Sequence, residues 1–375
     1  MSGLVAIRSP QAAILKSAKV NLRGLDHAEL TSWVQKIGMK RFRADQIFGW
    51  LHEKRVASFA AMSDLSKVDR ALLEAETSFD RLRVDLVAAA ADGTRKLRLR
   101  TADDQLIESV LIPNEGRGAT LCISSQLGCA LTCAFCATQS LGFRRNLATW
   151  EIVDQVYQAQ DLMASEAAAQ GETWPVRVTN LVFMGMGEPL HNYNQVRRSI
   201  AILTHPKGAA LAGRRITVSS AGLVPAIERF GREGLGLEVG LAISLNATTD
   251  DVRDRVMPIN TRWPIAELLA TIRKVPIHRR RFVTFEYVLL AGINDSEDDA
   301  DRLAVLLRGL RAQVNVIPFN PHPHAPFERP TPWRIAEFVE RCRTNGLHAY
   351  TRTPRGDDIG AACGQLALEG EAQTT

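Results

Sequence analysis

The sequence predicts an α/β protein in which a small N-terminal helical domain precedes a partial, open (βα)6 barrel. Three observations predict this class. Apolar residues recur at helical spacing up to about residue 95, six short β-rich runs follow, and most of these runs are separated by enough residues for a helix. Strands that alternate with helices form parallel sheets with right-handed crossovers. Six units are too few for a closed eight-stranded barrel, so we expect an open one.

The composition is typical of a folded globular protein, with 46% hydrophobic residues among 375. Charges interrupt every apolar run before it reaches the length of a membrane span, and the N-terminus lacks a signal-peptide pattern. We therefore expect a cytoplasmic protein with no membrane association. Thiols stay reduced in that compartment, so the six cysteines indicate metal or redox chemistry rather than structural disulfides.

The net charge is only +5, but basic residues cluster, as in the run His278-Arg279-Arg280-Arg281. A polyanionic partner such as RNA would suit these clusters. Each cluster could equally be a solvated surface turn, so charge alone leaves both interpretations open.

Residues 1–95 are predicted to form a small helical accessory domain that binds RNA. Asp26, followed three positions later by Glu29, resembles a capping box, and Gly38 suits the end of the helix that follows. Two more helices are predicted from the same i, i+3, i+4, i+7 spacing. The apolar positions of the three helices are Leu30, Trp33, Val34 and Ile37; Ala44, Ile47, Phe48 and Leu51; and Leu65, Val68 and Leu72.

Residues 96–368 are predicted to form the barrel and its catalytic C-terminal loop, and residues 369–375 a flexible tail. The β-rich runs are 120–125, 180–185, 215–220, 239–245, 283–290 and 313–319. The segment "PIAELLATIRKV" is an example of an intervening helix. Chemistry in such barrels takes place at the C-terminal ends of the strands, and a cysteine-rich stretch begins where the first strand ends.

The spacing of Cys129, Cys133 and Cys136, C-x3-C-x2-C, indicates an iron–sulfur cluster. Three thiolates on one loop can bind three irons of a cubic cluster and leave the fourth iron free for a substrate or cofactor. A structural zinc site would need four ligands, usually as two pairs, and no second pair has that spacing. Zinc and three unrelated buried cysteines remain as alternatives.

Seven motifs extend this pattern, in the order "CISSQLGCALTCAFCATQSLGFRRNL", "FMGMGEPLHN", "RRITVSSAGLVP", "AISLNA", "EYVLLAGIND", "NPHPHAPFERP" and "RGDDIGAACGQL". Together they resemble the RlmN/Cfr family of radical S-adenosylmethionine (SAM) RNA adenosine methyltransferases over roughly residues 25–368, and most closely its RlmN branch. The resemblance implies a radical SAM barrel, a [4Fe-4S] cluster on the three cysteines, and two SAM molecules per turnover.

The resemblance also implies a set of SAM-binding residues at successive strand ends: Gly187, Glu188, Ser219, Ser244, Leu245, Asn246 and Asn320. Glu188 would accept a hydrogen bond from the amino group of SAM, although its motif alone could be an ordinary strand-to-helix turn. Asn246 stands where many relatives carry histidine. Asparagine can still form hydrogen bonds, but it cannot become cationic.

In the same resemblance Cys363 carries the methyl group. Its thiolate takes a methyl from one SAM, a radical derived from a second SAM activates that methyl, and the carbon adds to adenine. Cys122 then attacks the Cys363 sulfur, which releases methylated RNA and leaves a disulfide. Glu108 is the implied proton acceptor. From the residues alone, each cysteine could be a buried small hydrophobe and Glu108 a solvent-facing strand residue, while Cys342 matches no motif.

The implied function is methylation of carbon 2 of adenosine in 23S rRNA and tRNA, with a flavodoxin or similar protein as electron donor and a monomeric enzyme. The target base would have to leave its stack. Methylation at carbon 8, as in the Cfr branch, is the alternative within the family. A non-catalytic iron–sulfur RNA-binding protein is the alternative outside it, but such a protein would need neither Cys122 nor Cys363.

Overall fold

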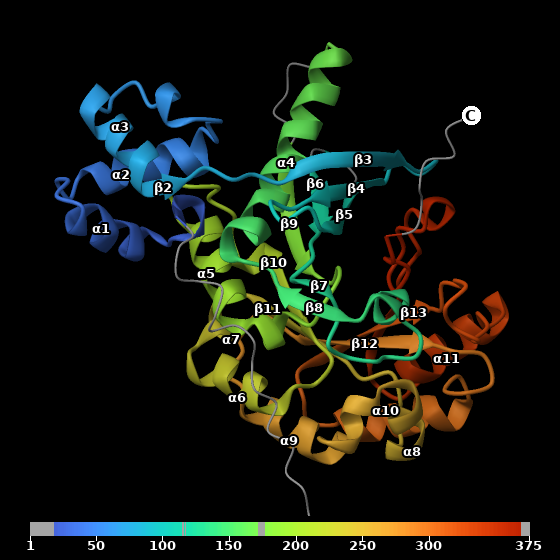
Figure 1. Ribbon diagram of the computed structural model, residues 1–375. Helices are drawn as coiled ribbons and strands as arrows, with labels where there is room; N and C mark the ends of the chain where they lie inside the picture. The colour runs from blue at the N-terminus through green and yellow to red at the C-terminus, as the bar shows by residue number, and fades with distance from the viewer. Residues whose placement is uncertain (1–18, 115, 117, 172–176, 369–375) are drawn as a thin grey trace, which may run out of the picture.

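The computed structural model describes residues 19–114, 116, 118–171 and 177–368; the expected flexible tail, 369–375, lies outside them. Its central feature is an open ten-stranded sheet (Figure 1) in the order β14-β13-β12-β11-β10-β9-β6-β5-β4-β3. The parallel part consists of β6 (Ala119–Cys122), β9 (Val178–Phe183), β10 (Ile216–Ser220), β11 (Gly240–Ser244), β12 (Val283–Leu289), β13 (Ala312–Pro318) and β14 (His348–Thr351). The first six are the strands that the sequence predicted, so the partial (βα)6 barrel is confirmed.

The sheet extends beyond the predicted barrel at both edges. Strand β14 adds a seventh parallel strand next to β13. On the other side β3 (Arg83–Ala89), β4 (Arg95–Arg100) and β5 (Leu106–Pro113) form an antiparallel extension that pairs with β6. Because β3 begins at Arg83, the sheet starts inside the segment 1–95 that the sequence assigned to the helical domain. We propose that the two domains meet between Ser78 and Arg83.

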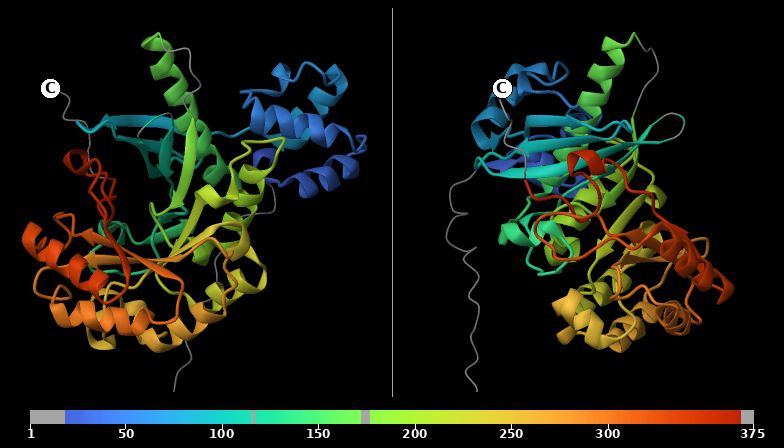
Figure 2. Two further views of the ribbon diagram at one scale, coloured as in Figure 1. Left: turned by 180° about the vertical axis from the view of Figure 1, so that it is seen from behind. Right: turned by 90° about the vertical axis from the view of Figure 1, so that its right-hand side faces the viewer.

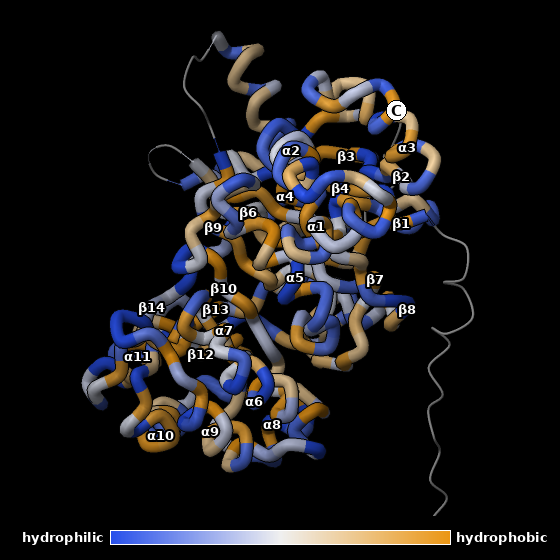
Figure 3. Tube along the Cα trace, turned by 90° about the vertical axis from the view of Figure 1, so that its left-hand side faces the viewer, coloured by the Kyte–Doolittle hydropathy of each residue, from blue (hydrophilic) through white to orange (hydrophobic). Residues whose placement is uncertain are grey.

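Helices cover the outer face of the parallel strands (Figures 1 and 2). They are α4 (Thr149–Ala169), α5 (Tyr193–Thr204), α6 (Val224–Arg232), α7 (Leu235–Glu238), α8 (Asp250–Val256), α9 (Ile265–Lys274), α10 (Glu297–Leu307) and α11 (Pro332–Thr344). Helix α9 is the one predicted from "PIAELLATIRKV". Apolar and polar positions alternate along these helices (Figure 3), as expected when one face packs on a sheet. Among the described helices, none is both long enough and apolar enough to cross a membrane.

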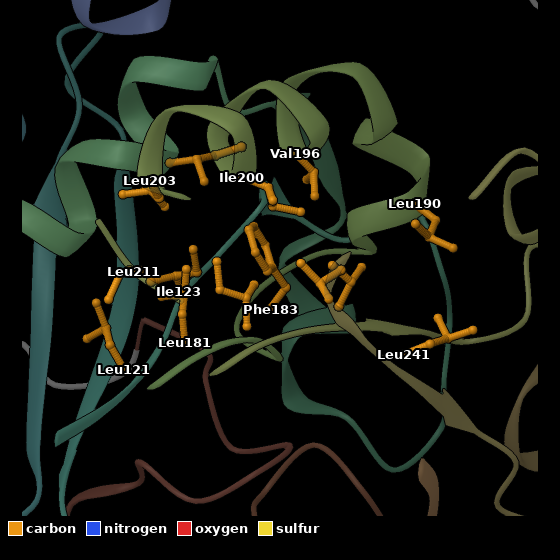
Figure 4. Close-up of a cluster of buried hydrophobic side chains, with 14 of the residues drawn as sticks. Leu121, Ile123, Leu181, Phe183, Leu190, Val196, Ile200, Leu203, Leu211 and Leu241 are labelled. Carbon is orange, nitrogen blue, oxygen red and sulfur yellow. The ribbon is translucent and has the colours of Figure 1, made fainter. Parts of the chain in front are cut away.

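Side chains on the outer face of the sheet form the main core. Leu121, Leu181 and Phe183 point from β6 and β9 toward Ile200 and Leu203 of α5 (Figure 4), and all five are buried. Successive side chains of a strand point to opposite faces. The residues between these core positions therefore face the inside of the barrel.

The N-terminal region contains α1 (His27–Lys36), α2 (Arg43–Phe48), which continues as a π-helical turn (Gly49–Glu53), and α3 (Lys67–Glu76). Two short strands, β1 (Val20–Asn21) and β2 (Thr77–Ser78), pair beside them. The capping box is confirmed, because the Glu29 N–H donates to the Asp26 carboxylate at 2.9 Å and the Asp26 N–H donates to the Glu29 carboxylate at 3.0 Å.

The predicted core face of the third helix is partly wrong. Val68 is 77% exposed, whereas Leu73, which the spacing did not select, is fully buried. Ser66 caps the helix through the Asp69 N–H, so Val68 lies in the first turn and on the side away from the core. Leu65 is buried and Leu72 packs against the core, so Val68 is the one predicted position of the three that lies off the packing face.

Candidate active site

A pocket with about 970 Å³ of space between its walls lies at the C-terminal ends of the parallel strands. The sequence-predicted site residues that line it are Cys129, Cys133, Cys136, Gly187, Glu188, Ser219, Ser244, Asn246, Asn320 and Cys363. Cys122 lines an adjoining pocket, which Cys363 lines as well. Leu245 and Glu108 line neither of these two pockets. The fold thus brings together residues from distant parts of the chain at the expected end of the barrel.

The three-cysteine loop, which carries Cys129, Cys133 and Cys136, lies between the paired strands β7 (Gln126–Gly128) and β8 (Phe143–Asn146). Gly128, directly before Cys129, has a φ of +70°, and a Cβ there would lie 1.6 Å from the Gly142 carbonyl oxygen. Only glycine fits that close approach. The loop is then held by backbone hydrogen bonds from Ala134 to Val256 at 2.9 Å and from Ala137 to Gly364 at 2.7 Å. The second bond ties the cysteine loop to the segment that carries Cys363.

Burial raises the pKa of all three loop cysteines, that of Cys129 to about 12. Ligands of this kind release their protons when a metal centre binds. Among the described residues, no group of three His, Cys, Asp or Glu side chains is close enough together to hold a single metal ion. A four-iron cluster does not require that arrangement, because each thiolate binds a different iron. Three thiols on one half-buried loop facing one pocket therefore fit the cluster better than zinc.

Glu188 is held rigidly at the end of β9. It is 3% exposed, and its two carboxylate oxygens accept hydrogen bonds from the N–H groups of Leu190 at 2.9 Å and Ala221 at 2.8 Å. Burial raises the pKa of Glu188 to about 7, although the N–H bonds oppose the shift. Gly187 precedes it with a φ of +96°, and a Cβ there would lie 2.5 Å from the Gln126 side chain. This glycine is thus required by contact with the neighbouring hairpin.

Arg253 of α8 connects the ends of β10 and β11, and sequence reasoning missed it. Its buried guanidinium donates to the carbonyl groups of Leu245 at 2.9 Å, Ala221 at 2.8 Å and Ser244 at 3.0 Å, and to Oδ1 of Asn260 at 2.9 Å. Burial lowers its pKa to about 10. The Leu245 side chain is buried in the core, so this residue supports the site through its backbone. No local motif distinguishes Arg253 from Arg255, the other arginine of α8.

Asn246 lies beyond the end of β11 in the left-handed region, with a φ of +58°. Asparagine adopts this conformation more readily than most residues. Its Oδ1 accepts from the Val288 N–H at 2.7 Å, and its Nδ2 lies 3.1 Å from the Met257 sulfur. The side chain therefore joins β11 to β12 and forms part of the pocket wall.

The segment 352–368, named here the C-terminal strap, carries Cys363 into the pocket. Nδ2 of Asn320 donates to the Cys363 carbonyl at 3.0 Å. Farther along, the Leu368 N–H donates to Oε2 of Glu108 at 3.2 Å. Glu108 is 1% exposed and forms an ion pair with Lys96 at 3.4 Å, so it is not the solvent-facing strand residue of the alternative interpretation.

The structure does not contain the disulfide that the resemblance implied. All six cysteines are free thiols, Cys122 and Cys363 included. Burial raises the pKa of Cys122 to about 12, and the nearby Cys363 adds to the shift. A thiol kept protonated by an apolar environment does not oxidise readily, because the thiolate is the reactive form. Cys342 is fully buried in α11, as expected for a structural residue.

Comparison with known proteins identifies the family. A solved radical SAM methyltransferase from Sphaerobacter thermophilus matches with a TM-score of 0.84 and 43% identity over 93% of this chain and 100% of that one. The dual-specificity RNA methyltransferase RlmN of Syntrophotalea carbinolica is 44% identical over 94% of this chain and 90% of its own. The chain belongs to the RlmN family. RlmN of Syntrophobacter fumaroxidans is 46% identical over 91% of this chain and 96% of its own.

Two family models divide the chain much as the fold does. The ribosomal RNA large subunit methyltransferase N-terminal domain matches residues 20–78, and the radical SAM superfamily matches residues 123–304. As a member of the radical SAM superfamily, the chain uses a [4Fe-4S] cluster and SAM. The first match ends at Ser78, the last residue of the N-terminal strand pair, while Cys363 lies beyond the second match.

Proposed function

We propose that this chain methylates carbon 2 of adenosine in 23S ribosomal RNA and in transfer RNA. One observation carries the proposal: Cys363 faces the same pocket as the three-cysteine loop, and Cys122 faces the adjoining pocket that Cys363 also lines. A protein that only bound RNA would need no free thiol next to a cofactor pocket. The curated relatives bear the name dual-specificity RNA methyltransferase.

The residues around the large pocket would hold the cofactors. When bound, the cluster and SAM supply the radical chemistry that removes a hydrogen atom from a methyl group. Cys129, Cys133 and Cys136 would bind the cluster, and Glu188 would accept a hydrogen bond from the SAM amino group. Ser219, Ser244, Leu245, Asn246, Asn320 and Gly187 complete the proposed SAM site. The protein contributes placement, because Arg253 and Asn246 hold three strand ends together at this pocket.

Cys363 is the proposed methyl carrier. Its thiolate would attack the methyl carbon of a sulfonium centre and displace the neutral thioether as leaving group, after which the sulfur-borne carbon would be joined to carbon 2 of the base. Cys122 frees the product by attacking the Cys363 sulfur, which requires both thiols in one pocket, as found. Glu108 is the proposed proton acceptor. To act, it would exchange the Leu368 N–H, which it binds at 3.2 Å, for the proton of the ring carbon.

We also propose that the enzyme works as a monomer in the cytoplasm, where its RNA substrates are found and thiols stay reduced. A flavodoxin or similar protein would supply the electron that the radical chemistry consumes. The helical region 20–78 and the basic clusters would bind phosphate groups, so RNA affinity should fall as salt rises.

Mass spectrometry of nucleosides from RNA treated with the reconstituted enzyme tests this function. We expect 2-methyladenosine; 8-methyladenosine would indicate the other branch of the family, and no methylated product would reject the proposal. A Cys122→Ala variant should accumulate RNA covalently attached to Cys363, because the release step is blocked. Cys342→Ala is the matched control and should accumulate none, since Cys342 lies in the core and outside both pockets.

A further inference from the structure

Two charged residues that the sequence motifs did not single out face the same pocket as Cys363. Glu286 lies on β12, opposite Asn315 of β13 in the sheet register. Arg352 follows β14 directly, and its backbone N–H donates to the Val316 carbonyl of β13 at 2.8 Å. Glu286, Arg352 and Cys363 all line the large pocket. A carboxylate and a guanidinium are thus presented to the reacting sulfur from strands on either side of β13.

Glu286 has one carboxylate oxygen without a partner. The residue is 5% exposed; its Oε1 accepts a hydrogen bond from Nδ2 of Asn315 at 3.1 Å, but its Oε2 is buried and has no hydrogen-bond partner. Burial raises the pKa of Glu286, and the charge of Arg352 opposes that shift. A buried oxygen left without a donor destabilises a protein by about 1–3 kcal/mol. Such an atom on a pocket wall indicates a ligand that supplies the donor.

Arg352 likewise has donors to spare. Within the part of the chain that the structure describes, its one side-chain hydrogen bond is from Nη1 to the Met184 sulfur at 3.6 Å, and thioether sulfur is a weak acceptor. Its guanidinium forms no ion pair within 4.0 Å among the described residues, although Cys363, Glu286 and Cys122 all raise the pKa of Arg352. A guanidinium has five N–H groups. Most of them are available to a ligand in the pocket.

We propose that Glu286 and Arg352 bind the amino–N1 edge of an adenine ring, with Glu286 accepting from the 6-amino group and Arg352 donating to N1. This inference rests on the proposed function and specifies how its target base is recognised. Enzymes that act on a flipped base read it through hydrogen bonds to this edge. Guanine and uracil present a carbonyl and an N–H in the reverse order, so the pair would reject them.

The target nucleotide and SAM both contain adenine, and the position of Cys363 favours the target. Carbon 2 is bonded to N1, so a sulfur-borne carbon that reaches carbon 2 lies next to N1. Arg352 lines both pockets that Cys363 lines, so its donors face the same space as the reacting sulfur. Of the proposed SAM residues, Glu188, Ser219 and Ser244 lie at or just beyond the ends of β9, β10 and β11 and line the large pocket only, whereas Asn320, which follows β13, lines both pockets. A donor at N1 would also withdraw electron density from carbon 2.

The test uses short RNA substrates in which the target adenosine is replaced by purine riboside, which lacks the amino group, or by 1-deazaadenosine, which lacks N1. We expect the wild-type enzyme to prefer adenosine over each analogue by about 10- to 100-fold in kcat/KM, since an unpaired buried group costs about 1–3 kcal/mol. Glu286→Met should abolish discrimination against purine riboside alone. Arg352→Met should abolish discrimination against 1-deazaadenosine alone.

The conservative variants Glu286→Gln and Arg352→Lys keep an acceptor and a donor, and should retain part of each preference. If Glu286→Met or Arg352→Met lowered kcat/KM equally on all three RNAs, the residue would have a merely structural role and the proposal would be overturned. The same holds if a variant left kcat/KM and the preference ratios unchanged. Adenine is present in both the target nucleotide and SAM. Methylation of Cys363 measured without RNA, as a function of SAM concentration, reports on SAM binding alone. A raised half-saturating SAM concentration in Glu286→Met, with unchanged RNA preferences, would assign the pair to SAM and overturn the proposal. Failure of the wild type to methylate the adenosine RNA would instead reject the proposed function, and this inference with it.

Discussion

The outer face of the parallel sheet packs in the core, and the inner face lines the pocket, although residues of the two faces alternate along the same strands. On the outer face, Leu181 (Figure 4) is fully buried in the main core, and so is Ile243. On the inner face, Ser219, Ser244 and Glu286 line the pocket. One residue of displacement therefore separates a position that stabilises the fold from one that faces the cofactors. Substitutions on the two faces should change different measurable quantities.

The largest difference between an effect on activity and an effect on stability is expected for two cysteines, Cys363 and Cys342. Cys363→Ser should lower RNA methylation by at least about 10⁴-fold, because a serine hydroxyl is far less nucleophilic than a thiolate and Cys363 acts together with the other reacting groups. Its melting temperature should stay close to that of the wild type. Cys342→Ala is the reverse case, with normal methylation and lower stability. Residual turnover in Cys363→Ser, measured by nucleoside mass spectrometry, would contradict its role as methyl carrier.

The next largest effect is on stability. Ile243→Ala should lower the free energy of unfolding by about 2–5 kcal/mol, because it leaves a cavity in the outer core. Its neighbour on β11, changed as Ser244→Ala, should leave unfolding nearly unchanged and raise the half-saturating SAM concentration. Denaturant unfolding and Cys363 methylation, measured on both variants, check the pair. Equal losses of stability would break the distinction between the two faces.

Glu188 belongs to the proposed SAM site, and its pKa also affects the stability of the fold. This pKa is raised from the ordinary value of 4.5 to about 7, so the folded chain keeps a proton that the unfolded chain loses above pH 4.5. Stability should therefore fall as pH rises from 4.5 to 7, by about 3 kcal/mol at about 1.4 kcal/mol per pKa unit. Glu188→Gln should lack this slope. Denaturant unfolding of the cofactor-free wild type and of Glu188→Gln at pH 5 and pH 8 measures this pH dependence. Equal changes in the free energy of unfolding in both proteins would show that Glu188 does not cause it.

The smallest effect is expected for Arg253. Arg253→Met removes four hydrogen bonds from the pocket rim and should lower the free energy of unfolding by about 2 kcal/mol, with a raised half-saturating SAM concentration. Arg255 of the same helix is exposed, so Arg255→Met is a matched control that should change neither quantity. Should both variants behave alike, Arg253 would not be the connection between the strand ends.

Local patterns were sufficient for much of this fold. The six barrel strands, helix α9 and the capping box of Asp26 and Glu29 each depend on residues close together in the sequence. The spacing of the three cysteines is equally local. These features could be predicted because alternation, helical periodicity and cap chemistry act over a few positions.

Long-range packing accounts for what could not be predicted. Arg253 gains its importance from carbonyl groups on two other strands, and Val68 is exposed because of where its helix begins. Glu108 sits on a strand of alternating polarity, yet Lys96 and the C-terminal strap cover it. Glu286 and Arg352 belong to the pocket only because β12, β13 and β14 are neighbours. None of these relations leaves a local pattern.

Cys363 lies near the end of the chain, after every strand of the sheet. During translation all ten strands are synthesised before the proposed methyl acceptor is added. A prematurely terminated chain that stopped in the strap would still contain the three-cysteine loop, but it would have no sulfur on which to carry a methyl group. Under the proposed mechanism, only a chain that extends through Cys363 could complete a turnover.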